Sequence, residues 1–472
     1  MAKMNRSPPP LKRSGRTAAL SAFMDRTLKF LSLKTTGGVF LLFLSLENWD
    51  DIWRRNQFIC AELARRFPDM HILFVAPPRD VSNAIRTRNF ASLRGGKPWH
   101  PDGLPNITIF RPLKFLPNSL SVARVFNEWL IRLQIRRATA SIRRLRMNET
   151  ALPEAVNTGD APVASVSGAQ PGDALTPPQT AVALEGSDSE LLWINAHDAV
   201  HLVGRMGESK VIYDITDDWT KFSHFTDRPA LRRLTIAQDA RLCQLADDVI
   251  VCSQALYDSK KELARRLHLI PNGVDAAHYA AVIKGTGPLP PDADPAAWPR
   301  PVYGYTGSIH ADRVDVDMVA AIARLLIARN LPGTLVLLGP NMLSTADSQR
   351  LLATGRVALP GPRPYHDLPQ FMRAFDVCMT PHCMTEFVES LNPIKLWEYL
   401  AAGKPIVSTD VAGFRDFPDL VRIARTPEEF LAQLQAALAE GTSKAAHRQA
   451  TAASHTWQAR VDQIVSLLSS RK

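Results

Sequence analysis

The C-terminal half of the chain contains the stretch NPIKLWEYLAAGKPIVS, residues 392–408. Pro393 suits the first turn of a helix, and apolar side chains follow it at helical spacing. The turn around Gly403 then leads into residues 406–408, which predict a short buried strand. A helix that is followed closely by a buried strand is typical of an α/β domain with a parallel sheet.

The same alternation extends over most of the chain, in two series. The later series predicts strands at 302–305, 335–338, 377–380 and 406–408, with helices at 317–328, 368–374, 392–402 and 427–439. The earlier series predicts strands at 39–45, 72–75, 107–110, 191–195, 211–214, 249–252 and 268–270, with helices at 53–67 and 230–246. We therefore expect an α/β fold of two Rossmann-like, doubly wound domains that face a central cleft. Ligands of such sheets bind beyond the carboxyl ends of the strands.

Composition shifts suggest the domain boundaries. We expect a basic N-terminal tail at 1–37, a first domain at 38–280, a Pro-rich linker at 281–300, a second domain at 301–443, and a C-terminal segment at 444–472 whose helix, 445–468, returns to the first domain. Residues 149–190 are rich in Ala, Pro, Ser and Thr and lack Lys and Arg, which predicts a disordered insertion in the first domain.

The whole-chain composition excludes several classes of protein. Of 472 residues 46% are hydrophobic, which excludes a wholly disordered or collagen-like chain. The five cysteines form no CxxC pair and no zinc spacing, so we assign no metal, cofactor or disulfide. No run approaches the ~18–20 apolar residues that cross a bilayer. We expect a cytoplasmic protein.

The net charge of +10 suggests an anionic partner. It concentrates in the tail and in the arginine-rich segment 124–146. Either could hold the protein on the inner face of a membrane, and either could equally be a disordered leader or a solvated helix face. The arginines lack the interleaved aromatic residues of a nucleic-acid surface, so we expect no nucleic-acid partner.

Polar residues at predicted strand and helix ends of the second domain suggest a phosphate site. Gly307 would let a phosphate approach the backbone. Lys395 and Glu398 lie three residues apart and share a helix face, where lysine suits a pyrophosphate and the carboxylate a ribose diol. Asn392 could cap that helix. The alternatives are a plain turn and a surface salt bridge.

Other candidate residues carry weaker signals. In the second domain Arg363 could reach a phosphate and Tyr365 could border a base, or both could be ordinary loop residues. In the first domain Asp217 and Asp218 follow a strand and could act as a general base or bind sugar hydroxyls. His197 follows another strand. Capping, salt-bridge and structural roles are the alternatives for these three.

Four stretches in this order resemble the GT-B glycosyltransferases, in particular the family 4-like enzymes of teichuronic-acid and exopolysaccharide biosynthesis. They are YDITDDW (213–219), IPNGVD (270–275), GYTGS (304–308) and NPIKLWEYLAAGKPIV (392–407). The resemblance implies a nucleotide-sugar donor on the second domain and a glycan or lipid-linked acceptor on the first. Many relatives carry a Glu eight residues before the helix Glu, where this chain has Ser390.

The resemblance also implies roles for single residues. Glu398 would bind the donor ribose, while Lys395 and Arg313 or Arg363 would neutralise the diphosphate. Trp49, Arg54 and Arg55 resemble the acceptor-side loop of the family.

The expected activity is therefore hexosyl transfer in cell-surface polysaccharide biosynthesis. If the reaction retains the anomeric configuration, the departing phosphate can take the acceptor proton. If it inverts, Asp217 or Asp218 is the candidate base. A sugar-nucleotide epimerase of the same fold and a non-catalytic basic binding protein are the alternatives.

Overall fold

The structure is a computed structural model that describes residues 39–94, 97–118, 121–150, 190–285, 288–293 and 298–469. The predicted tail, 1–37, lies outside these residues, as does most of the predicted insertion, 149–190.

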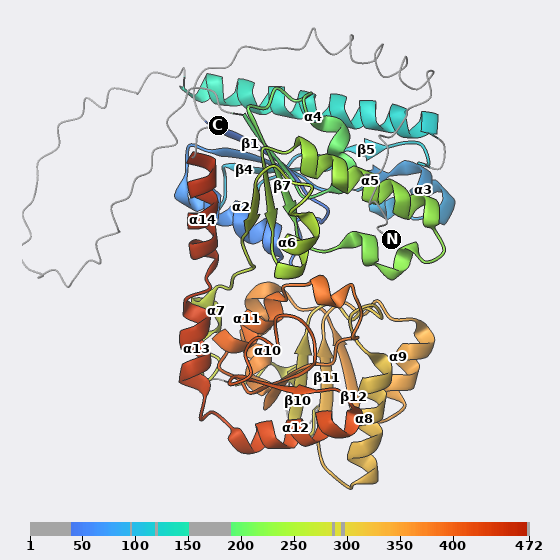
Figure 1. The fold of residues 1–472 in the computed structure, drawn as a ribbon, viewed down its shortest axis with the longest axis vertical. Helices are drawn as coiled ribbons and strands as arrows, with labels where there is room; N and C mark the ends of the chain where they lie inside the picture. The colour runs from blue at the N-terminus through green and yellow to red at the C-terminus, as the bar shows by residue number, and fades with distance from the viewer. Residues whose placement is uncertain are drawn as a thin grey trace, which may run out of the picture.

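The first domain is built on a seven-stranded parallel sheet of order β4-β2-β1-β6-β7-β8-β9 (Figure 1). Its strands are β1 (Phe40–Leu44), β2 (His71–Val75), β4 (Ile107–Phe110), β6 (Glu190–Ile194), β7 (Lys210–Ile215), β8 (Asp248–Val251) and β9 (Leu267–Leu269). A two-stranded ribbon of β3 (Arg79–Asp80) and β5 (Leu113–Lys114) adjoins it. The helices are α2 (Arg55–Arg66), α3 (Val81–Thr87), α4 (Ser121–Thr150), α5 (Pro229–Leu245), α6 (Gln254–Lys260) and α7 (Ala276–Ala280).

The second domain is built on a six-stranded parallel sheet of order β12-β11-β10-β13-β14-β15. Its strands are β10 (Val302–Thr306), β11 (Thr334–Leu338), β12 (Val357–Gly361), β13 (Val377–Thr380), β14 (Ile406–Thr409) and β15 (Val421–Ala424). The helices are α8 (Val316–Ala328), α9 (Thr345–Leu352), α10 (Leu368–Ala374), α11 (Ile394–Ala401), α12 (Pro427–Glu440) and α13 (Ala445–Ala453). The last helix, α14 (Trp457–Ser469), packs on the first domain. The expected α/β architecture of two Rossmann-like domains is confirmed.

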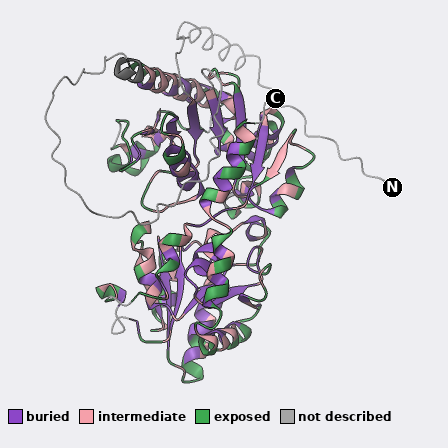
Figure 2. Cartoon of the chain, turned by 90° about the vertical axis from the view of Figure 1, so that its left-hand side faces the viewer, coloured by how far each residue is buried: buried purple, intermediate pink, exposed green. Residues whose placement is uncertain are grey.

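Strand β1 shows why the central strands are continuous apolar runs. Leu41 and Phe43 pack with α2 and α14 on one face of the sheet, whereas Leu42 and Leu44 pack with α4 and α5 on the other. Helices cover both faces, so every position of the strand is buried (Figure 2).

The end of the chain differs from the prediction. The single helix expected over 445–468 was wrong, because the segment forms α13 and α14 with a break at Ser454–Thr456. At the break, Val274 donates its N–H to the carbonyl of His455 and accepts from the N–H of Trp457. Helix α13 packs beside α11 in the second domain, and α14 packs on α2 in the first.

The arginines of the segment 124–146 do not form the single basic face that was considered. Arg132 is buried, Arg136 donates to the carbonyl of Arg205, and Arg143 pairs with Glu190. Arg137 and Arg144 remain exposed. Arg132, Arg136 and Arg143 thus contribute to the packing of α4 on the first domain.

All five cysteines are free thiols, and four of them are buried. Within the part of the chain that the structure describes, every helix is too short or too polar to cross a membrane.

The second sheet depends on a glycine in its central strand. A Cβ on Gly304 would lie 2.2 Å from ring atoms of the buried Phe375. We predict that Gly304→Ala lowers the stability of the second domain by about 1–3 kcal/mol, because the ring must shift in a packed core. Urea unfolding followed by fluorescence measures the change. In Gly304→Ala/Phe375→Leu the two substitutions should cost less than the sum of their separate effects, and strictly additive losses would contradict the contact.

Candidate functional site

The loops at the carboxyl ends of the two sheets meet between the domains. After β7 the N–H of Asp218 donates to Oγ of Ser390 at 3.3 Å, and after β8 Ser253 Oγ donates to the Ser390 carbonyl at 2.7 Å. The N–H of Tyr365 donates to the carbonyl of Asp51, in the loop after β1, at 3.0 Å. The site expected between the domains is therefore formed by strand-end loops of both sheets.

Lys395 lies over the backbone of Gly307 at the end of β10. A Cβ on Gly307 would lie 2.2 Å from Cε and 2.5 Å from Nζ of Lys395, and the φ of Gly307 is +128°. The ammonium also lies 5.4 Å from the ring centroid of Tyr305. Glycine is thus required here both for the backbone conformation and for the approach of the lysine.

The surroundings of Lys395 lower the pKa of its ammonium group. Desolvation lowers the pKa of Lys395 to about 8, and the nearby positive charge of Arg313 acts in the same direction. The carboxylates of Glu398 and Asp217 oppose the shift. Arg313 and Lys395 are thus two neighbouring cations, and an anionic ligand beside them would favour the charged form of the lysine.

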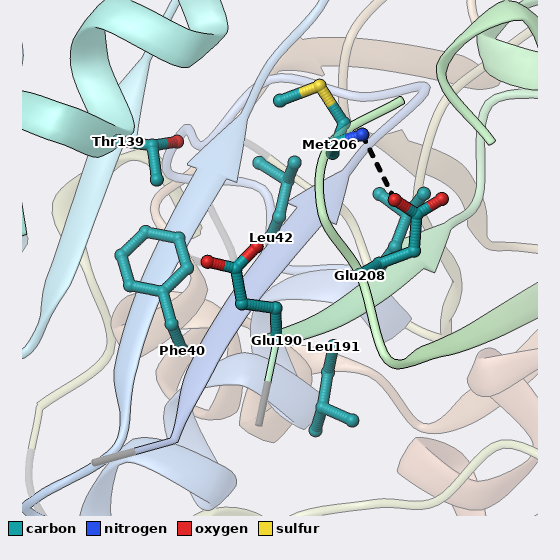
Figure 3. A pocket seen from close by; sticks show the side chains of 8 residues that line it. Phe40, Leu42, Thr139, Glu190, Leu191, Met206 and Glu208 are labelled. Carbon is teal, nitrogen blue, oxygen red and sulfur yellow. Dashed lines mark hydrogen bonds between the residues drawn. The ribbon is translucent and has the colours of Figure 1, made fainter. Parts of the chain in front are cut away.

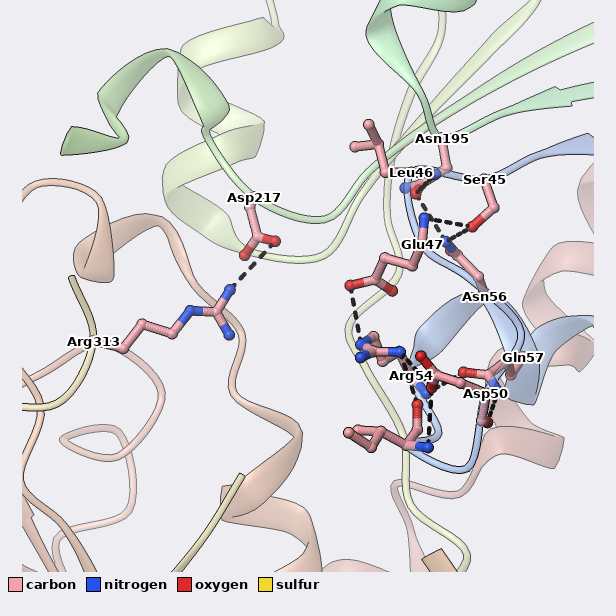
Figure 4. Close-up of polar contacts among 11 residues, drawn as sticks. Ser45, Leu46, Glu47, Asp50, Arg54, Asn56, Gln57, Asn195, Asp217 and Arg313 are labelled. Carbon is pink, nitrogen blue, oxygen red and sulfur yellow. Dashed lines mark hydrogen bonds and ion pairs between the residues drawn. The ribbon is translucent and has the colours of Figure 1, made fainter. Parts of the chain in front are cut away.

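Charged side chains of both domains face one another at this point, and we call Glu47, Arg54, Asp217, Arg313 and Lys395 the interdomain charge cluster. Nη2 of Arg313 lies 3.7 Å from Oδ2 of Asp217, across the domain boundary (Figure 4). Nε of Arg54 lies 3.3 Å from Oε1 of Glu47. Desolvation raises the pKa of Asp217, and Arg313 opposes the shift.

Glu47 was not among the predicted site residues. It lies in the loop after β1, three residues beyond Leu44, so the rule that selected Asp217 in the loop after β7 would have selected Glu47 too. Desolvation raises the pKa of Glu47 to about 7, against the opposing charge of Arg54. The side chain keeps 37% of its surface exposed, so solvent between the domains weakens the desolvation.

Glu398 lies one helical turn beyond Lys395 on α11 and is buried. Its Oε1 accepts a hydrogen bond from the Tyr279 hydroxyl at 3.0 Å. Desolvation raises the pKa of Glu398, while Lys395 lowers it. Glu398 is buried and Lys395 is half-buried, so the pair is not the surface salt bridge that was considered.

The start of α11 is held by the first domain instead of being capped by its own side chains. Pro393 is the N-cap residue and makes no side-chain cap. Oδ1 of Asn392 accepts from the N–H of Asn272 at 2.9 Å, and the Asn392 carbonyl accepts from Nδ2 of Asn272 at 2.6 Å. The helix-capping role considered for Asn392 was therefore wrong.

Arg55 is a buried structural residue and does not lie on an acceptor surface. Its Nε lies 3.0 Å from Oδ2 of the fully buried Asp214, and its Nη1 donates to Oδ1 of Asn272 at 3.2 Å. Trp49 likewise packs edge-on against Phe74, at 5.1 Å between ring centroids. Of the three residues predicted for the acceptor side, only Arg54 belongs to the interdomain charge cluster.

Tyr365 and Arg363 have structural partners. The ring of Tyr365 stacks on His278 at 4.3 Å, within an aromatic group that includes Trp53 of the first domain. Arg363 pairs with Asp292 and lies over the ring of Phe371. Neither belongs to the interdomain charge cluster.

Asp218 and His197 belong to the segments of the first domain that follow β7 and β6. Asp218 is buried, and its Oδ1 accepts from the hydroxyl of Thr220 at 2.5 Å, which fixes the turn after β7. His197, Asp217 and Asp218 line a small pocket whose wall also includes Asp239 and Lys260, an ion pair at 2.6 Å. This pocket brings together the three residues that were considered as catalytic candidates, His197, Asp217 and Asp218.

Another pocket lies far from the interdomain loops. It is lined by Phe40 and Glu190, which begin β1 and β6, and by Thr139 of α4 (Figure 3). Amino ends of parallel strands lie opposite the edge where such sheets bind ligands, so this pocket is not the candidate site. Among the described residues, no group of three or more His, Cys, Asp or Glu side chains could hold a metal ion.

Sequence comparison finds a family model that matches the second domain and a relative that matches 43% of the chain. Residues 300–441 match the family model of glycosyl transferases group 1. TuaH of Bacillus subtilis (strain 168), provisionally named as a teichuronic acid biosynthesis glycosyltransferase, is 27% identical over 220 residues. This match covers 43% of the present chain and 51% of TuaH, about half the length of each.

Solved structures resemble almost the whole chain. WaaG, a glycosyltransferase involved in lipopolysaccharide biosynthesis, aligns over 91% of this chain and 99% of its own, with a TM-score of 0.53 and 12% identity. A structure described as trehalose-6-phosphate from E. coli bound with UDP-2-fluoro glucose aligns over 92% and 99%, with a TM-score of 0.55 and 13% identity. Residues 300–441 thus resemble the glycosyl transferases group 1 family, and the chain as a whole has the GT-B fold.

Proposed function

We propose that the protein is a glycosyltransferase that moves a sugar from a nucleoside-diphosphate donor to a glycan or lipid-linked acceptor in cell-surface polysaccharide biosynthesis. The observation that carries the proposal is the position of Lys395 over the Gly307 backbone, with Arg313 close by and Glu398 one turn further along α11. The family of residues 300–441 supports the same activity.

The donor side has the groups that a nucleoside diphosphate requires. Lys395 and Arg313 supply positive charge to the diphosphate, and Gly307 exposes backbone to it. Glu398 is positioned for a ribose diol, with Tyr279 fixing one of its oxygens. In the reaction, negative charge grows on the departing phosphate oxygens, and prearranged cations lower the barrier by stabilising that charge.

The acceptor side is formed by the first domain. Glu47 and Asp217 are the carboxylates of the interdomain charge cluster, and either is placed to accept the proton of an acceptor hydroxyl in an inverting reaction. In a retaining reaction the departing phosphate takes that proton. The anomeric configuration of the product, read by NMR, distinguishes the two. Asp218 is less suited to this role because Thr220 and the nearby Lys221 occupy its carboxylate.

The acceptor class rests on the names of the relatives. TuaH is named for teichuronic acid and WaaG for lipopolysaccharide, both polymers of the cell surface. A glycan or lipid-linked intermediate of such a polymer is therefore the acceptor class that we propose.

A panel of nucleotide sugars tests the proposal. We expect one donor to raise the thermal unfolding midpoint and to be turned over, and Lys395→Ala to lower the turnover by about 2–4 kcal/mol of transition-state stabilisation. The control is Lys261→Ala, which removes an exposed lysine of the first domain. Activity of Lys395→Ala within twofold of the unmodified protein would exclude the role of Lys395, and an isomerised donor without transfer would indicate an epimerase.

The pKa of Lys395 gives a pH dependence. The ammonium is charged below a pKa of about 8 and neutral above it, so affinity for a nucleoside diphosphate should fall as the pH rises through this range. Isothermal titration calorimetry with UDP at several pH values measures the dependence. Lys395→Arg keeps its charge and should bind with little change from pH 7 to about pH 9. Identical pH profiles for the two proteins would refute the assignment.

A further inference from the structure

Exposed apolar side chains gather on one part of the first domain. Ile85 on α3 and Phe90 on the adjacent 3₁₀ helix (Phe90–Leu93) are each 60% exposed, and Val122 in the first turn of α4 is 57% exposed. Phe115 and Leu116, directly after β5, are also exposed. Isolated exposed apolar residues are ordinary, whereas a group of large ones is typical of a contact surface.

The elements that carry these side chains pack on one another. Helix α3 contacts both the 3₁₀ helix and β5, and β5 contacts α4. Figure 1 shows α3, β5 and one end of α4 on the same side of the first domain. The buried Asn127 fixes the turn after β5, since its Oδ1 accepts from the N–H groups of Phe115 and Leu116 at 3.3 and 3.2 Å. These two side chains are therefore held outward by a rigid backbone.

Basic residues are interleaved with the apolar ones. Between Arg79 and Arg124 the sequence has eight Lys or Arg residues and two Asp residues. One of those carboxylates, Asp80, is paired with Lys114 at 2.7 Å. Arg86, Arg88 and Arg94 are exposed. We call Ile85, Arg86, Arg88, Phe90, Arg94, Phe115, Leu116 and Val122 the apolar–basic patch.

The elements of the patch follow the carboxyl ends of strands of the first sheet. Helix α3 follows the carboxyl end of β2, and β5 with the start of α4 follows the carboxyl end of β4. These ends belong to the same edge of the sheet as the loops after β1 and β7, which carry Glu47 and Asp217. The patch and the loops that carry Glu47 and Asp217 therefore follow strand ends on the same edge of the sheet.

We propose that the apolar–basic patch docks the protein on an anionic lipid bilayer. Apolar side chains on a rigid frame can enter the boundary between headgroups and acyl chains, while the flanking arginines pair with lipid phosphates. A nucleic acid would use the arginines but not aliphatic side chains such as Ile85 and Val122. The inference deepens the proposed function, because it brings a lipid-linked acceptor to the first domain, but bilayer binding does not itself require catalysis.

Vesicle flotation of the full chain tests the patch directly. Vesicles of phosphatidylcholine, with and without an equal part of phosphatidylglycerol, are the probe. We expect binding to the anionic vesicles only, weakened by salt, and reduced at least about tenfold both in Ile85→Ser/Phe90→Ser and in Arg86→Glu/Arg88→Glu. The matched control is Ile327→Ser/Arg329→Glu, which alters an exposed isoleucine and arginine of the second domain and should bind like the unmodified chain.

Three outcomes would overturn the proposal: no binding of the unmodified chain, undiminished binding of both patch variants, or tighter binding to a DNA duplex that the apolar substitutions leave unchanged. Calorimetry with UDP on the same variants separates this inference from the proposed function. Patch variants that no longer bind vesicles but still bind UDP would support the patch. If the unmodified chain itself does not bind UDP, that result would count against the donor site alone.

Discussion

The buried ion pair between Arg55 and Asp214 connects the core of the first domain to the helix that carries the donor-side residues. Asp214 lies in β7, and Arg55 begins α2. The same guanidinium donates to Asn272, which in turn holds the backbone and side chain of Asn392 immediately before α11. A buried charge that loses its partner costs about 3–5 kcal/mol, so the chain of contacts sets the position of α11 relative to the first domain.

The position of α11 determines where Lys395 and Glu398 lie between the domains. Because α11 begins at Ile394, Lys395 lies in its first turn and Glu398 lies one turn later. The lysine fits only because Gly307 has no side chain, and it shares its surroundings with Arg313. The first domain contributes the carboxylates of Glu47 and Asp217 on the opposite side. Lys395 and Arg313 of the second domain and two carboxylates of the first thus lie close together, as the proposed transfer from a diphosphate leaving group would require.

Much of the fold could be predicted from the sequence. Strands that are buried on both faces appear as continuous apolar runs, such as residues 40–44, and these alternate with segments whose apolar residues have helical spacing. Part of the site could be predicted for a related reason, since Gly307, Lys395 and Asp217 all follow predicted strand ends or open a helix. Residues with distant partners could not be assigned. Arg55 is separated from Asp214 by 159 positions, and no local pattern shows that the two are paired.

The remaining discrepancies have similar causes. Tyr365 meets Trp53 across the domain boundary, and Arg363 is paired with Asp292, so both loop residues have distant protein partners. The break between α13 and α14 arises because Val274 pairs with the backbone on both sides of Thr456. Glu47 is the opposite case, since its place after β1 was visible in the sequence.

A crystal structure of the protein with a bound nucleoside diphosphate examines the central claim most directly. The account predicts the diphosphate on the backbone of Gly307, with Nζ of Lys395 and the guanidinium of Arg313 within hydrogen-bond distance of its oxygens and the ribose near Glu398. A nucleotide bound elsewhere, with Lys395 still packed on Tyr305 and remote from any phosphate, would contradict it.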